Sequence, residues 1–144
     1  MFGDRDQLRE QFIKAWDRAR NGEEMSALDS ALAELIREHP EYHELLADRE
    51  RALTAEFPPE GGQSNPFLHL AMHLSIREQA ATDRPSGIRD LHQRLCGRFG
   101  PMNAEHQMIE CLGRALWEAQ RSGTPPDENA YLECLRRLER SPVS

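Results

Sequence analysis

Residues that favour β-strands are scarce in this sequence. One Val, five Ile and three Thr are the only β-branched residues among the 144. Branching at Cβ suits a pleated sheet, so a chain this poor in such residues cannot populate one. At this length the chain can still bury a sizeable core without disulfides or metal ions. The composition therefore predicts an all-α fold.

Cysteine is also sparse. Cys96, Cys111 and Cys134 are odd in number and lack the spacing of a C-x-x-C motif. They fit neither a disulfide framework nor a cysteine zinc site. We therefore expect reduced thiols in the core.

Long apolar runs and an excess of positive charge are missing as well. No run approaches the roughly 18 consecutive apolar residues of a membrane-spanning helix, and the chain is charged from Asp4 onward. These features predict a cytosolic protein. Eighteen Lys and Arg against 25 Asp and Glu leave a net charge of −7. We therefore expect no nucleic-acid and no membrane partner, since both need a basic surface.

A cluster of basic residues near the C-terminus is the one feature that favours a nucleotide or RNA. It consists of Arg136, Arg137 and Arg140, and carboxylates such as Glu133 surround it. Such a face is typical of solvated intrahelical ion pairs.

Apolar residues recur with helical spacing along almost the whole chain. The breaks carry residues that start or stop helices, namely Ser26, Pro40, Asn65-Pro66, Gly100-Pro101 and Asn103. We predict a bundle of about six or seven helices in a single domain over residues 1–140, with a frayed tail over 141–144. The predicted helices cover residues 4–20, 26–39, 40–57, 66–81, 88–99 and 103–121, with a short seventh from 127. The helix over 66–81 is apolar on most sides and is expected at the centre.

The longest predicted loop covers residues 58–64. It contains Gly61-Gly62-Gln63, the tripeptide with which peptide-release factors reach the ribosomal peptidyl centre. Its flanks are acidic and prolyl rather than basic, so we do not assign that role.

Two pairs of polar residues lie four positions apart on predicted helices. His69 and His73 belong to the apolar helix over 66–81, and His106 and Glu110 to the helix over 103–121. The spacing places both members of a pair on one helix face. Three imidazoles and a carboxylate suit zinc, iron or manganese, and facing helices are how bundles build internal metal sites. We predict a metal site formed by these four residues.

Other residues are weaker candidates for additional ligands. His39 and His43 flank Pro40 and fall on different predicted helices, so the helical spacing does not apply to them. His92 lies near the apolar face of its helix, where a structural role competes with that of a further ligand. Glu78 lies well round the helix from His73 and is expected to pair with Arg77, Arg84 or Arg89.

Several short motifs along the chain occur together in one known family. They are Asn65-Pro66-Phe67-Leu68-His69 with His73, Glu78-Gln79, Asp83-Arg84-Pro85-Ser86-Gly87-Ile88, His-Pro-Glu-Tyr-His at 39–43, Glu105-His106, Glu110-Cys111-Leu112 and Trp117-Glu118-Ala119-Gln120. With these motifs the chain resembles the small proteobacterial family catalogued as domain of unknown function 1841. The resemblance covers nearly the whole chain and implies a cytosolic bacterial protein. A fainter likeness to hemerythrin-type bundles exists, although there the order of the HxxxE and HxxxH pairs differs.

Two functional hypotheses follow. In the first, the protein binds one or two transition-metal ions between the helices over 66–81 and 103–121, with hydrolytic or redox activity if a coordination position stays open. In the second, it is a metal-free adaptor whose His and Glu residues form a structural hydrogen-bond network. No glycine-rich phosphate loop is present, so no nucleotide cofactor is expected. The partner, a protein or a small molecule, and the oligomeric state stay open.

Overall fold

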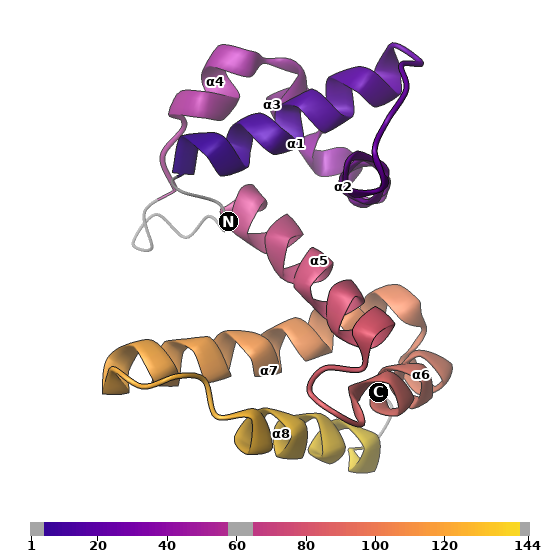
Figure 1. Cartoon of the computed structure of the whole chain (residues 1–144), viewed down its shortest axis with the longest axis vertical. Coiled ribbons are helices and arrows are strands. Elements are labelled where there is room, and N and C mark those ends of the chain that lie inside the picture. The colour runs from indigo at the N-terminus through magenta and orange to yellow at the C-terminus, as the bar shows by residue number, and fades with distance from the viewer. Residues whose placement is uncertain (1–4, 58–64, 142–144) are drawn as a thin grey trace. The chain divides into compact units, whose positions relative to one another are not determined.

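In the computed structural model, which describes residues 5–57 and 65–141, every regular element is a helix. The all-α prediction is confirmed. The elements are α1 (Arg5–Arg20), α2 (Ala27–Arg37), the 3-10 helix η1 (Pro40–Tyr42), α3 (His43–Ala47), α4 (Arg49–Thr54), α5 (Pro66–Thr82), α6 (Ile88–Phe99), α7 (Pro101–Ser122) and α8 (Glu128–Arg140) (Figure 1). The predicted loop over 58–64 and most of the predicted frayed tail lie outside the described residues.

The chain forms two compact units, Met1–Leu74 and Ser75–Ser144, and α5 continues from the first into the second. Each unit is described by itself below. A single domain over residues 1–140 stays a prediction. Within the described ranges no helix combines the length and apolar character needed to span a bilayer, and the cytosolic location also stays a prediction.

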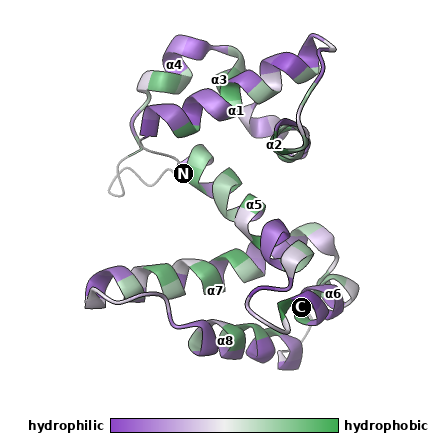
Figure 2. Cartoon of the chain, viewed as in Figure 1, coloured by the Kyte–Doolittle hydropathy of each residue, from purple (hydrophilic) through white to green (hydrophobic). Residues whose placement is uncertain are grey.

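The first unit packs α2, α3 and α4 around α1. Its core contains aromatic and aliphatic side chains spaced three or four residues apart on α1 and α2, joined by the start of α5. Phe12, Ile13, Leu35, Ile36 and Phe67 are all at most 2% exposed. The start of α5 is largely hydrophobic (Figure 2). Only part of it is buried, however, because Leu68 is 56% exposed.

The predicted continuous helix over 40–57 is wrong. The structure has η1, α3 and α4 in its place, with the chain extended at Asp48 (φ −105°, ψ 92°). The Asp48 side chain accepts a hydrogen bond from the backbone N–H of Arg51. An aspartate in this conformation is a helix N-cap, so it ends one helix and starts the next without changing the apolar spacing.

The second unit consists of the end of α5 with α6, α7 and α8, and the last three pack pairwise. Helix α7 begins at Pro101, two residues before the predicted cap at Asn103. Gly100 has φ 85° and serves as the cap on both sides, ending α6 and starting α7. Glycine adopts this positive φ without steric cost, and proline suits the first helical position that follows.

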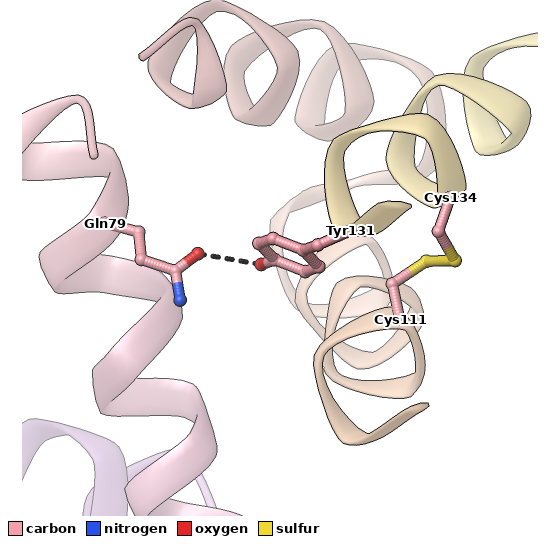
Figure 3. The surroundings of a disulfide bond; sticks show 4 residues. All are labelled: Gln79, Cys111, Tyr131 and Cys134. Atoms are coloured by element: carbon pink, nitrogen blue, oxygen red, sulfur yellow. Dashed lines mark hydrogen bonds between the residues drawn. A yellow bond between two sulfur atoms is a disulfide. The ribbon is translucent and has the colours of Figure 1, made fainter. Parts of the chain in front are cut away.

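Cys111 and Cys134 form a disulfide, so the prediction of reduced thiols is wrong for these two residues (Figure 3). Their Cα atoms lie 5.8 Å apart on α7 and α8, within the usual range for a disulfide. The residues are 23 positions apart in sequence. No local sequence spacing therefore predicts this disulfide, which forms only when the two helices pack. Cys96 is a free thiol, as predicted.

Tyr131 on α8 anchors the end of α5. Its hydroxyl donates to Gln79 Oε1 at 2.7 Å, and the ring is 5% exposed (Figure 3). Burial raises the pKa of Tyr131 strongly, so the phenol stays a neutral donor.

We expect Tyr131→Phe to lower the free energy of unfolding by about 1–2 kcal/mol, because the Gln79 oxygen loses its donor. Urea denaturation followed by circular dichroism measures the change. A double variant that also carries Gln79→Leu removes both polar groups and is expected to recover part of the loss. A single variant as stable as the parent would contradict the predicted contribution of this hydrogen bond.

Candidate metal centre

The two histidines at the start of α5 lie side by side. His69 and His73 are one helical turn apart, and their Nε2 atoms are 3.2 Å from each other. Their ring centroids are 4.7 Å apart. His73 is completely buried, whereas His69 is half-buried. Both residues belong to the first unit.

A third imidazole, that of His39, joins them from the end of α2. Its ring centroid lies 4.8 Å from that of His73 and 5.4 Å from that of His69. The three residues each offer a ligand atom, and these atoms lie within 4.8 Å of one another. We call His39, His69 and His73 the histidine cluster.

The local sequence explains how His39 reaches this position. Proline disfavours the α-helical conformation of the residue before it, and His39, which precedes Pro40, has φ −123° and ψ 70°. Its Nδ1 lies 2.7 Å from the carbonyl oxygen of Leu35 in the last turn of α2. The ring therefore leaves the helix while it satisfies one of the terminal carbonyl groups.

This hydrogen bond also sets the tautomer of His39. A carbonyl oxygen can only accept, so Nδ1 carries the proton. In the neutral ring Nε2 then bears the lone pair. A backbone carbonyl that holds the non-ligating nitrogen is the usual outer support of a metal-bound histidine.

The distance between the two α5 histidines suits a small transition-metal ion. Two nitrogens at about 2.0–2.1 Å from a tetrahedral ion are roughly 3.3 Å apart, and the Nε2 atoms of His69 and His73 are 3.2 Å apart. Imidazole suits zinc and iron better than calcium or magnesium, which prefer oxygen.

Tyr42 covers one side of the cluster. Its ring stacks on that of His39 with a centroid distance of 5.6 Å and an interplanar angle of 2°, and lies 6.4 Å from the ring of His69. Burial, followed by the nearby charge of Glu41, raises the pKa of Tyr42. Its hydroxyl therefore stays protonated and adds no negative charge beside the imidazoles.

His43, the other histidine of the H-P-E-Y-H motif, is engaged elsewhere. Its Nε2 lies 2.7 Å from the carbonyl oxygen of Ile36, and its ring packs on Trp16 at a centroid distance of 4.6 Å. These contacts fasten α3 to α1 and α2, and a role of His43 as an additional ligand stays a prediction.

Two further candidates belong to the second unit. His92 on α6 lies one turn before Cys96, with its Nε2 3.6 Å from the Cys96 sulfur. Glu78 is exposed on α5. Arg77, one of its expected partners, pairs instead with Glu105. The roles of His92 and Glu78 as additional ligands stay predictions.

His106 and Glu110 also belong to the second unit, one turn apart on α7 and both exposed. The metal site that combines His106 and Glu110 with His69 and His73 stays a prediction. From the sequence, His39 is predicted only as an additional ligand. The signal that favours it is a histidine between the end of a helix and a proline, where the chain must turn out of the helix.

Fold and site together define an all-helical protein with a cluster of three imidazoles in its first unit. The chain belongs to the family described as domain of unknown function (DUF1841), whose model matches residues 4–137. This match confirms the resemblance to domain of unknown function 1841. No curated protein and no solved structure matches the chain.

Proposed function

We propose that this protein binds one transition-metal ion through His39, His69 and His73. The observation that carries the proposal is the convergence of three imidazole ligand atoms within 4.8 Å. The hydrogen bond from His39 Nδ1 to Leu35 supports it, because it leaves Nε2 as the ligand atom. Zinc is the first candidate, since it favours nitrogen ligands and four-coordinate geometry; iron and manganese follow.

We further propose that His106 and Glu110 supply additional ligands. The proposal rests on their spacing of one helical turn and on the mixed nitrogen and carboxylate ligand sets of zinc and iron. Three histidines with a water in the fourth position form an alternative ligand set. A metal with such an open position lowers the pKa of its bound water and supplies hydrolytic chemistry, whereas iron supplies redox chemistry.

A metal-free adaptor is the second candidate function. The contact of 3.2 Å between His69 Nε2 and His73 Nε2 favours it, because one shared proton would make this contact a hydrogen bond. The histidine cluster would then hold α2 and α5 together within the first unit. Function would lie on another surface, where a protein partner binds.

The deciding experiment measures metal content and metal-dependent stability of protein purified without a histidine tag. We expect about one zinc or iron per chain, and a visible absorption band would favour iron. After chelation, free zinc at 100 times its Kd is expected to stabilise the native state by about 2.7 kcal/mol. For a chain of this length the melting temperature then rises by roughly 6–10 °C.

Magnesium is the matched control, since it prefers oxygen ligands and is expected to leave the melting temperature unchanged. Metal content far below one per chain, together with a melting temperature that zinc does not move, would contradict metal binding and favour the adaptor.

A further inference from the structure

A cleft of about 410 Å³ lies along α7 and α8 in the second unit. Its size falls within the range of about 300–1,000 Å³ that is typical of small-molecule sites. Both cysteines of the disulfide, Cys111 and Cys134, line it. A small molecule in the cleft would therefore contact both residues of the disulfide.

The two cysteines differ in accessibility. Cys134 is half-buried, whereas Cys111 is only 4% exposed. An attacking sulfur in the cleft would thus reach the Cys134 sulfur, and the Cys111 sulfur would leave. The direction of attack follows from this asymmetry, since exchange depends on access to the sulfur attacked.

Each cysteine has an arginine three residues further along its own helix. Arg114 follows Cys111 on α7, Arg137 follows Cys134 on α8, and both arginines line the cleft. Residues three apart on a helix lie on neighbouring positions of one face. Positive charge close to a cysteine favours its thiolate and attracts an anionic ligand.

Carboxylates also line the cleft, but two of them are already engaged. Glu133 accepts a hydrogen bond from Arg140 at 3.1 Å, and Asp127 caps α8 by accepting from the backbone N–H of Ala130 at 3.0 Å. Glu118 is the third. Arg114 makes no ion pair within residues 5–57 and 65–141. Its exposed guanidinium is therefore available to a carboxylate of a ligand.

We propose that this cleft binds a small thiol that carries carboxylate groups, and that the Cys111–Cys134 disulfide exchanges with it. The thiolate of the ligand attacks Cys134 Sγ and forms a mixed disulfide as the Cys111–Cys134 bond breaks. The electron pair of that bond leaves on Cys111 Sγ, which takes up a proton. A second ligand thiolate then attacks the ligand sulfur of the mixed disulfide and releases Cys134. Two small thiols are oxidised to one small disulfide, and the protein disulfide is reduced to two thiols.

The test compares reduction by glutathione, which carries two carboxylates, with reduction by uncharged 2-mercaptoethanol. The full-length protein carries Cys96→Ser, so that only the two cysteines of the disulfide are present. Mass spectrometry of the alkylated protein gives the rate constant of reduction for each reductant. We compare variants by the rate constant for glutathione divided by that for 2-mercaptoethanol. This ratio is independent of differences in the accessibility of the disulfide itself. We expect this ratio to fall about fivefold in Arg114→Gln or Arg137→Gln, and further in the double variant.

Arg121→Gln is the matched control. Arg121 lies on α7 and stacks on Trp117 at 4.7 Å, outside the residues that line the cleft. We expect it to leave the ratio unchanged within about twofold. A second measurement uses Cys111→Ser with Cys96→Ser, in which oxidised glutathione is expected to modify Cys134.

Three outcomes would overturn the proposal. The first is a ratio that is the same in all arginine variants, and the second is an equal fall in Arg121→Gln, which would indicate general charge attraction. The third is loss of the helical circular dichroism signal on reduction, which would make the disulfide a structural bond only.

Discussion

Replacing His73 with alanine is expected to weaken zinc binding by at least about a hundredfold. Loss of an outer partner of a metal ligand alone costs about 10–100-fold, and we propose His73 as a direct ligand. The residue is completely buried and its Nε2 lies 3.2 Å from that of His69. Isothermal titration with zinc, using protein freed of metal by a chelator, measures the loss.

Two variants separate metal binding from stability in this experiment. His43→Ala removes a neighbouring imidazole that packs on Trp16, so we expect lower stability with unchanged zinc affinity. His69→Cys keeps a ligand atom at a half-buried position and is expected to retain zinc, because thiolate also binds it.

The adaptor hypothesis makes the opposite prediction for the same variants. If His73→Ala destabilises the protein but leaves metal content as it was, the histidine cluster is a hydrogen-bond network. His106→Ala and Glu110→Ala address the additional ligands separately. A loss of affinity in either variant supports that residue as a ligand, whereas unchanged affinity in both supports a site of three histidines with an open position.

Breaking the ion pair between Arg77 and Glu105 is expected to lower the free energy of unfolding substantially. Two hydrogen bonds of 2.9 and 3.1 Å join the guanidinium to the carboxylate. The side chain of Glu105 is 6% exposed and that of Arg77 is 30% exposed. Removing one partner of a buried pair costs about 3–5 kcal/mol. Because solvent screens the partly exposed guanidinium, we expect about 2–3 kcal/mol for Glu105→Gln.

Urea denaturation measures this effect, with Glu118→Gln as a control on the same helix. Glu118 is exposed, and we expect its replacement to change the free energy of unfolding by no more than about 0.5 kcal/mol. A double variant with Arg77→Met tests whether the two residues act as a pair, since a coupled pair gives non-additive losses. Additive losses, or a loss below that of the control, would contradict the prediction.

The sequence predicted the helices well where local signals agree. Asn65 accepts hydrogen bonds from the backbone of α5, and Ser26 does the same for α2. Both residues are predicted as helix caps from their side-chain chemistry, because a capping hydrogen bond joins residues that are only a few positions apart in the chain. The break at Asp48 was missed because apolar spacing continues across it, and a short capping residue inside a helical pattern has several possible conformations.

Of the candidate site, the sequence predicted the pair on α5, because helical geometry alone places residues four apart on one face. It could not rank His39 above His43, since the two flank the same proline and differ only in their surroundings. His39 turns toward α5 and His43 toward Trp16. This choice depends on how α2, α3 and α5 pack.

The amino-acid sequence by itself determined the all-helical class, most helix ends and the HxxxH pair, since each depends on composition or on interactions between near neighbours in the chain. Only the tertiary structure decided that His39 joins the pair and that Cys111 bonds to Cys134. Both depend on residues more than 20 positions apart. Such contacts form when helices pack. Packing depends on the shapes of whole helix surfaces, so the spacing of residues within one helix does not predict it.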